Sequence, residues 1–212
     1  GRGQYPVPCG PAPGRNAMSP TTSADQDRFL RISTPLSAEV RARLRAGDMV
    51  PLSGDIYTAR DAAHRRLHEA LVRGLPLPID LSAATLFYAA PSPTPVGKVI
   101  GSIGPTTSYR MDVFTPTLIE HGLRGMIGKG NRSPEVALAI KRYGAVYFGA
   151  IGGIAALTAQ CVKHMEMVAY EDLGPEAIRK LTVADLPLVV INDAEGNDLY
   201  AQAQNDWRIL TE

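Results

Sequence analysis

The sequence has few of the features that mark several common classes of protein. It contains only two cysteines, Cys9 and Cys161, so we expect neither a disulfide framework nor a metal centre built from this chain alone. The net charge of +1, from 22 basic and 21 acidic residues, gives no indication of binding to nucleic acid or to an anionic membrane surface. No apolar run approaches the roughly 20 residues needed to span a bilayer, and the N-terminus lacks the apolar core of a secretory signal. A reducing cytoplasm is therefore the simplest expected location.

The sequence does contain enough apolar residues for one substantial core, since 45% of its 212 residues are hydrophobic. Residues 1–27 are rich in proline and glycine and have almost no aliphatic side chains, which predicts a flexible, disordered tail. Met18 in this tail is a candidate native start, in which case residues 1–17 would be derived from a vector or be an upstream extension. The folded domain is expected over residues 28–205.

Short apolar segments alternate with helical patterns along this domain. Strands are predicted over residues 29–34, 49–57, 84–90, 98–103, 124–127, 145–151, 166–170 and 188–192. Helices are predicted over residues 38–46, 110–121, 134–143 and 154–165, and another follows residues 57–64 and ends near residue 73. This order predicts an α/β domain with a largely parallel sheet. In such sheets, ligands bind beyond the carboxyl ends of the strands.

The segment over residues 99–112 has the most distinctive pattern. An apolar strand is predicted to end at a Gly-Pro turn, after which Thr106, Thr107 and Ser108 place hydroxyls at the start of a helix. Thr107 is expected to cap that helix, and Arg110 follows within about one turn. Free N–H groups, hydroxyls and a guanidinium suit a carboxylate or phosphate. An ordinary capped helix with a solvated arginine explains this segment, taken alone, equally well.

Two more cations stand at similar junctions. Arg60 begins a helix, where a positive side chain opposes the helix dipole and usually has a partner or a ligand. His64 lies one turn further on the same face and is interpreted as a packing or hydrogen-bonding residue. Lys129 lies between Gly128 and Gly130, without the spacing of a phosphate-binding P-loop. Three cations and a hydroxyl cluster, without nearby catalytic carboxylates, predict a pocket for a dicarboxylate.

Several of these segments resemble the C-terminal domain of class I, iron–sulfur-dependent fumarate hydratases. In the two-subunit versions this domain is the beta subunit, and the beta subunit of L(+)-tartrate dehydratase shares its architecture. The resemblance covers roughly residues 30–200. The segments that carry it are YTARDAAH (57–64), GPTT (104–107), RMD (110–112), GKGNR (128–132), GAIGG (149–153) and YEDLG (170–174).

The resemblance implies a single swivelling β/β/α domain that closes over a [4Fe–4S] cluster. Cysteines of a partner alpha subunit would hold this cluster, so that this chain alone binds no cofactor or metal. One iron would act as a Lewis acid on the substrate. Carried over by position, the substrate-binding residues would be Arg60, Thr106, Thr107, Arg110 and Lys129.

Thr106 would also be the catalytic base. A free alcohol is a poor base, so this role requires nearby cations and a dry, closed site. Tyr109 departs from the small residues that are common at this position in the family, which leaves the identity of the substrate open.

The expected function is that of the beta subunit of a hydro-lyase, active only with its alpha subunit in a hetero-oligomer. Fumarate and L-malate, the pair of the tricarboxylic acid cycle, are the first expected substrates. Two alternatives remain: the beta subunit of L(+)-tartrate dehydratase, and a non-catalytic module of the same fold that binds anions or a partner. An alpha-type chain with three separated cysteines would favour an enzyme, whereas a stable monomer without such a partner would favour the module.

Overall fold

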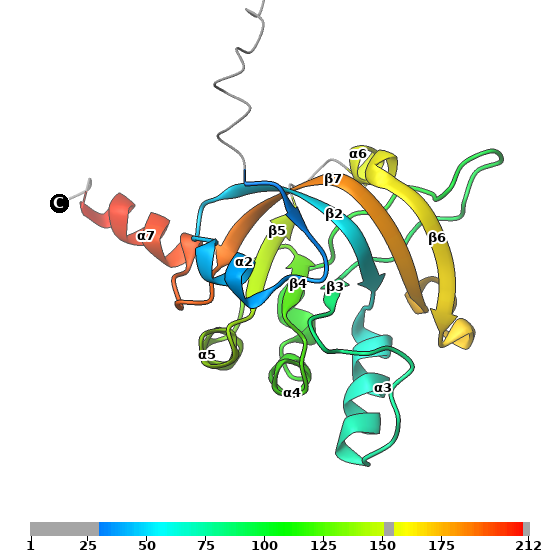
Figure 1. Cartoon of the computed structure of the whole chain (residues 1–212), viewed down its shortest axis with the longest axis horizontal. Coiled ribbons are helices and arrows are strands. Elements are labelled where there is room, and N and C mark those ends of the chain that lie inside the picture. The colour runs from blue at the N-terminus through cyan, green and yellow to red at the C-terminus, as the bar shows by residue number, and fades with distance from the viewer. Residues whose placement is uncertain (1–29, 151–154, 210–212) are drawn as a thin grey trace, which may run out of the picture.

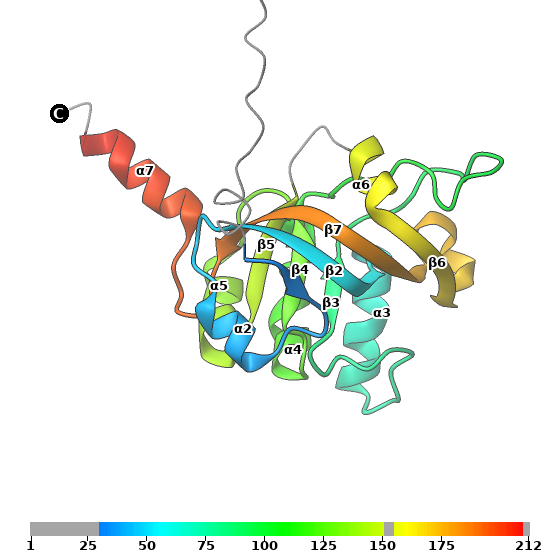
Figure 2. The ribbon, with the colours of Figure 1, turned by 45° about the horizontal axis from the view of Figure 1, so that its top comes forward.

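A mixed sheet forms the centre of the computed structural model, which describes residues 30–150 and 155–209. The strands are β1 (Ile32–Ser33), β2 (Met49–Thr58), β3 (Thr85–Phe87), β4 (Gly125–Gly128), β5 (Val146–Ala150), β6 (Val162–Ala169) and β7 (Ile178–Asn192). Strands β1 to β5 pair in parallel, and β7 pairs antiparallel with β2, β5 and β6. Because β7 pairs with both β2 and β5, the strands β2, β3, β4, β5 and β7 form a closed ring (Figures 1 and 2).

Helices α3, α4 and α5 lie together on one side of this sheet (Figure 1). The helical elements are α2 (Ala38–Arg43), α3 (Asp61–Val72), η1 (Ser108–Met111), α4 (Thr115–Glu120), α5 (Pro134–Tyr143), α6 (Ala155–Cys161), η2 (Glu171–Glu176) and α7 (Leu199–Ile209). The hydroxyls of Ser37 and Ser133 cap α2 and α5, as their places in the sequence predict. No helix within the two described ranges is long and apolar enough to cross a membrane.

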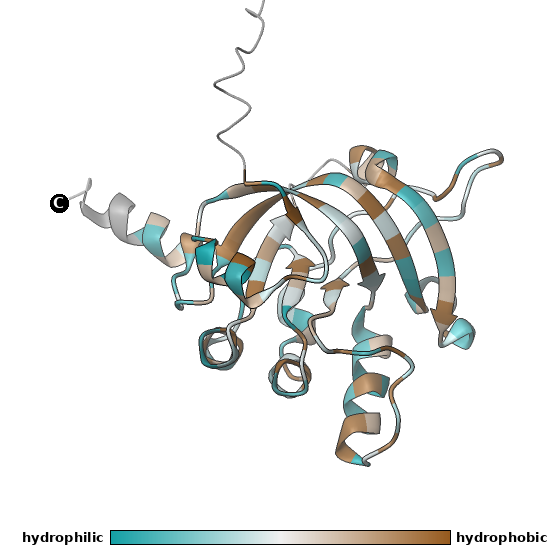
Figure 3. Ribbon diagram, viewed as in Figure 1, coloured by the Kyte–Doolittle hydropathy of each residue, from teal (hydrophilic) through white to brown (hydrophobic). Residues whose placement is uncertain are grey.

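Alternation along the central strands divides the buried side chains between two cores. Phe87 and Phe148 belong to a core that also contains the buried apolar residues of β2 and most of those of β7. Leu86 and Tyr147, each next to one of these in sequence, belong to a second core with the buried residues of α3, α4 and α5. Strands β4 and β5 are buried along their whole length, and Figure 3 shows them in white and brown. The predicted α/β class is confirmed.

The segment predicted as a strand over residues 98–103 is irregular, so this prediction was wrong. Its two isoleucines, Ile100 and Ile103, are nevertheless buried in the first core, which explains the apolar pattern. Gly101 packs so closely on the preceding proline-rich loop that a Cβ there would lie 2.3 Å from the carbonyl oxygen of Ser92. The Ser92 N–H donates to the carbonyl of Ser102 at 2.9 Å, so the chain folds back on itself instead of joining the sheet.

Two predicted helices also differ from the structure. The helix expected over residues 110–121 is divided into η1 and α4, because Pro116 occupies the first turn of α4 and starts a new helix. The helix expected over residues 154–165 ends at Cys161, where β6 begins. Cys161 is therefore only partly buried against the first core and does not lie in the middle of a helix.

The prediction of a largely parallel sheet missed the length of β7. The sequence pattern indicated a strand over residues 188–192 only, whereas β7 runs for 15 residues. Charged side chains at Arg179, Lys180 and Asp185, together with Pro187, interrupt its apolar pattern. Asp185 also has a positive φ of 49°. The expected tail over residues 1–27, with Cys9, and the expected Gly152–Gly153 junction lie outside the described residues.

Candidate functional site

The predicted site residues follow the carboxyl ends of neighbouring parallel strands. Arg60 lies just beyond β2, where it is the N-cap residue of α3. Thr106 reaches the end of β3 through its main chain, since its N–H donates to the carbonyl of Tyr88 at 2.6 Å. Lys129 directly follows β4. Because Thr58 pairs with Phe87 and Phe87 with Ile127, these strand ends lie side by side at one edge of the sheet.

Arg60 and Arg110 meet at one carboxylate. The Arg110 Nε donates to Asp61 Oδ1 at 2.9 Å, and Asp61 Oδ2 lies 3.8 Å from Arg60 Nη2. Arg60 Nη2 also lies 3.4 Å from Glu176 Oε1, while the other oxygen of Glu176 accepts from the N–H of Ala62 at 3.0 Å and so caps α3. Asp61 and Glu176 were not predicted as partners of these cations. Asp61 follows Arg60 directly in the sequence, and this adjacency could have indicated the pair.

Lys129 is joined to the hydroxyl-rich segment through its main chain. Thr107 and Lys129 form a parallel β-bridge. The N–H of Ser108 donates to the carbonyl of Lys129 at 2.9 Å, and the N–H of Lys129 donates to the Ser108 hydroxyl at 3.2 Å. The side chains of Lys129 and Thr107 are exposed, and among the described residues the ammonium has no ion-pair partner.

Thr107 does not cap a helix with its side chain, contrary to the prediction. It precedes the four-residue 3₁₀ turn η1 without a side-chain capping hydrogen bond, so its hydroxyl is not committed to the backbone there. Thr106 is half-buried, and Tyr109 is 68% exposed. The structure thus gathers the predicted residues into two groups, one around Asp61 and one around Lys129. The two groups are linked through η1, which carries Arg110.

His64 is confirmed as a packing and hydrogen-bonding residue. Its side chain is fully buried, with Nδ1 3.0 Å from the carbonyl oxygen of Arg60 and its ring edge-on to that of Tyr88 at 4.9 Å between centroids. Burial lowers the pKa of His64 to about 4, and the nearby Arg132 contributes in the same direction. The imidazole is therefore neutral at physiological pH and helps to fix the start of α3.

Comparison with known proteins identifies the family. A family model described as "Fumarase C-terminus" matches residues 10–203. The chain belongs to the fumarase C-terminus family. This confirms the resemblance that the sequence motifs indicated.

The relatives fall into two groups, which differ in the share of their own length that this chain covers. It is 44% identical over 156 residues to the anaerobic class I fumarate hydratase of Escherichia coli (strain K12), an alignment that covers 73% of the chain and 28% of that protein. Fumarate hydratase 2 of Leishmania major is 40% identical over 158 residues, with 74% and 28% covered. A protein of Methanocaldococcus jannaschii assigned as subunit beta of L(+)-tartrate dehydratase is 40% identical over 166 residues, with 76% and 85% covered. The chain thus spans little more than a quarter of these fumarate hydratases.

A buried charged cluster beneath the site was not predicted. The side chain of Arg132 has no exposed surface, and its Nε and Nη2 both lie 2.8 Å from Asp112 Oδ1. The guanidinium carbon lies 4.7 Å from the ring centroid of Tyr147 and 5.3 Å from that of Tyr88. Burial disfavours the charge, but Tyr88, Asp112 and Tyr147 raise the pKa of Arg132. Arg132 and Asp112 lie within two of the motifs named above, residues 128–132 and 110–112. The pattern of apolar residues in the sequence does not indicate that either side chain is buried.

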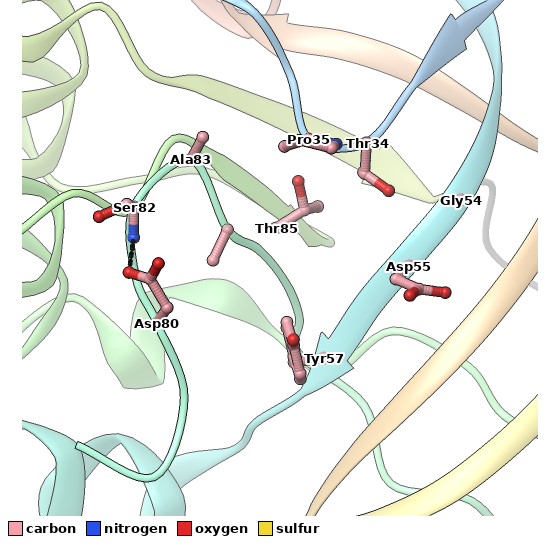
Figure 4. Close-up of a pocket in the computed structure, with 10 residues that line it drawn as sticks. Thr34, Pro35, Gly54, Asp55, Tyr57, Asp80, Ser82, Ala83 and Thr85 are labelled. Carbon is pink, nitrogen blue, oxygen red and sulfur yellow. Dashed lines mark hydrogen bonds between the residues drawn. The ribbon is translucent and has the colours of Figure 1, made fainter.

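A pocket of about 460 Å³ lies toward the amino-terminal side of β3, away from these strand ends (Figure 4). Its ten lining residues include two carboxylates, Asp55 and Asp80, and no lysine or arginine. Asp80 accepts a hydrogen bond from the N–H of Ser82 at 2.8 Å, which is drawn in Figure 4. An acidic pocket of this kind repels a dicarboxylate, so the basic edge is the better candidate site in this fumarase C-terminus domain.

Proposed function

We propose that this chain is the beta subunit of a hydro-lyase that reversibly adds water to, or removes it from, a dicarboxylate. The relatives support the class of reaction, since they are named as fumarate hydratases and as a tartrate dehydratase subunit. The observation that carries the proposal is the placement of Arg60, Arg110 and Lys129 beside Thr106 at one edge of the sheet. Fumarate and L-malate are the first proposed substrates.

In this proposal the three cations bind the two substrate carboxylates. Asp61 occupies the Nε of Arg110, and within the described part of the chain the terminal nitrogens of this half-exposed guanidinium have no hydrogen-bond partner, so they can bind a carboxylate. Arg60 lies within ion-pair distance of Asp61 and Glu176, so its positive charge is balanced before any ligand binds. The exposed Lys129 supplies a third positive charge. The Thr107 hydroxyl, which does not cap η1, contributes a hydrogen bond to the substrate.

Thr106 is the proposed base. In dehydration the ionised Thr106 oxygen would take the proton from the carbon next to one carboxylate while the C–O bond on the neighbouring carbon breaks. The released hydroxide and the proton that Thr106 then returns together make the water; hydration is the reverse. A threonine alkoxide is costly in water, so the site must be closed and flanked by positive charge at that moment. We infer that the chain does this as a swivelling β/β/α domain that closes over its partner.

The residues of this chain do not fit an iron–sulfur cluster. Such clusters are held by several cysteine thiolates. Cys161 is the only cysteine within the described ranges, and burial raises the pKa of its thiol. No group of three potential metal ligands occurs among the residues that the structure describes. We therefore propose that a cysteine-bearing alpha subunit holds the [4Fe–4S] cluster and forms a hetero-oligomer with this chain in the cytoplasm.

L(+)-tartrate dehydration is the second candidate activity. One observation favours it: this chain covers 85% of the relative assigned as subunit beta of that enzyme, so the two chains have similar extents. A non-catalytic module of the same fold is the remaining alternative. Relative kcat/KM values for L-malate and L-tartrate would separate the two enzymes, and inactivity with both would favour the module.

The decisive experiment compares this chain alone with its complex. The chain would be expressed alone and together with an alpha-type chain from the same genome, reconstituted anaerobically with iron and sulfide, and assayed with L-malate, fumarate and L-tartrate. We expect the single chain to be colourless and inactive, and the complex to be brown and active. A stoichiometric cluster on the single chain, or a loaded complex that dehydrates none of the substrates, would contradict the proposal.

A further inference from the structure

A closed chain of hydrogen bonds begins and ends in the loop that carries Lys129. The N–H of Lys129 donates to the Ser108 hydroxyl at 3.2 Å. The Ser108 and Tyr147 hydroxyl oxygens are 2.9 Å apart, and the Tyr147 hydroxyl donates to the carbonyl of Gly130 at 2.9 Å. A hydroxyl has a single proton to donate. Since that of Tyr147 goes to Gly130, Ser108 must donate to Tyr147, and every bond in the chain runs in one direction.

The surroundings leave this arrangement little freedom. Ser108 has no exposed surface, and a Cβ at position 128 would lie 1.9 Å from its hydroxyl oxygen, so only glycine fits there. Burial raises the pKa of Tyr147, which keeps its hydroxyl protonated and able to donate. The Arg132 guanidinium packs on the Tyr147 ring and is itself fixed by Asp112. Two loops that lie about twenty residues apart in the sequence are thus clamped together at one buried hydroxyl pair.

We propose that Tyr147 is a positioning residue for substrate binding, which acts through Ser108 and Gly130 to hold the main chain of Lys129 at the mouth of the site. This inference rests on the proposed function for the role of Lys129. Tyr147 itself is buried and does not touch the substrate. Thr106 is attached differently, through its N–H to the carbonyl of Tyr88, so its position does not depend on the Tyr147 hydroxyl.

This difference predicts a specific kinetic effect. A carboxylate bound by Lys129 is bound in both the ground state and the transition state, so misplacement of the lysine weakens both equally and raises KM. In the complex with the alpha subunit, Tyr147→Phe should raise KM for the dicarboxylate by roughly fivefold to fiftyfold and change kcat by less than about threefold. Ser108→Ala should have a similar effect, and the double variant should be no worse than either single variant because both hydroxyls belong to one chain of bonds.

Hydrogen exchange on the full single chain tests the clamp without any activity measurement. In Tyr147→Phe, peptides that cover residues 108–112 and 128–133 should exchange several times faster, while the Thr106 amide and peptides from β7 and α5 remain unchanged. Tyr143→Phe is the matched control, since it removes a tyrosine hydroxyl of α5 that donates to the exposed Glu120. This control should leave both loops and KM unchanged.

The outcomes test the positioning role of Tyr147 and the proposed function separately. Wild-type exchange in both loops, or faster exchange throughout the domain, would overturn the positioning role. A fall in kcat without a rise in KM would also overturn it. Faster exchange confined to the two loops, in a complex that acts on no dicarboxylate, would support the clamp and refute the proposed function.

Discussion

Removal of one charge from the buried Arg132–Asp112 pair should destabilise the domain strongly. Asp112 is 5% exposed and accepts hydrogen bonds from the Arg132 Nε at 2.8 Å and from the N–H of Ser133 at 2.5 Å, and the Arg132 Nη2 lies at ion-pair distance, 2.8 Å, from the same carboxylate. In Asp112→Asn the guanidinium stays buried without a counter-charge, and breaking such a pair costs about 3–5 kcal/mol. For a domain of this size the corresponding fall in Tm is about 6–20 °C.

Urea denaturation followed by circular dichroism at pH 7 measures this loss, with Asp172→Asn as the matched control. Asp172 also pairs with an arginine through two hydrogen bonds, but its side chain is 63% exposed and that of Arg66 is 38% exposed. Water and salt screen that pair, so the control should unfold at nearly the wild-type midpoint. A loss below about 1 kcal/mol in Asp112→Asn would refute the reasoning that the buried guanidinium depends on Asp112.

Three further predictions concern the site and its neighbours. In the assembled enzyme, Thr106→Val should lower kcat by roughly 10²–10⁴, whereas Thr107→Val should mainly raise KM; normal turnover in the first would exclude Thr106 as the base. Arg60→Lys and Arg110→Lys should each lower kcat/KM by an amount equivalent to about 2–5 kcal/mol of transition-state stabilisation, because an ammonium cannot replace a bidentate guanidinium. Wild-type kinetics in either variant would identify that arginine as a solvated residue. Since burial holds the pKa of His64 near 4, below its ordinary 6.5, the unfolded chain binds the extra proton. The free energy of unfolding should therefore fall by roughly 3 kcal/mol as the pH is lowered from 6.5 to 4. Urea denaturation at several pH values in this range should show a weaker dependence of this free energy on pH in His64→Gln than in the wild type.

The fold could be predicted where local pattern and long-range pairing agree. Strand β2 was predicted with nearly its observed bounds, and Ser133 with Pro134 indicated the start of α5 correctly. The segment over residues 98–103 has an equally apolar pattern, but its isoleucines fill a core from an irregular loop. Apolar periodicity reports burial, and burial does not require a place in the sheet. The sequence alone therefore cannot distinguish a buried loop from a strand.

Strand β7 illustrates the opposite error. Its outer half pairs with β6 and carries charged residues such as Lys180, whose ammonium bonds to Glu166 at 2.6 Å across the two strands. Cross-strand charge pairs of this kind are favourable in a half-exposed sheet. The sequence does not indicate such a charge pair until the partner strand is known, because the two residues are not neighbours in the sequence. The closed ring of strands depends on β7 and was unpredictable for the same reason.

The candidate site shows which properties a linear pattern can indicate. Arg60 and Lys129 were found because each directly follows a strand, and parallel pairing brings those strand ends to one edge. Thr106 was predicted from a strand that the structure does not contain, and it reaches the same edge through the hydrogen bond from its N–H to the carbonyl of Tyr88. Asp61 and Glu176 were missed as partners of the cations because their role depends on side-chain direction and on a contact between α3 and η2. Ser108 was identified as one of the hydroxyls at this junction, but its pairing with Tyr147 was missed because the sequence carries no periodic signal for a hydroxyl pair.

The carboxylates explain how a cationic site can exist before its ligand arrives. Arg60 and Arg110 approach the same side chain, Asp61, and Glu176 supplies a second negative charge to Arg60. These four charges sum to zero, and the attraction to the two carboxylates offsets the repulsion between the two guanidinium groups. Lys129 then leaves the edge with one net positive charge, which attracts a dianion. A dicarboxylate that enters a closed, water-poor site would meet arginines already held in place, so little of its binding energy would be spent on ordering them.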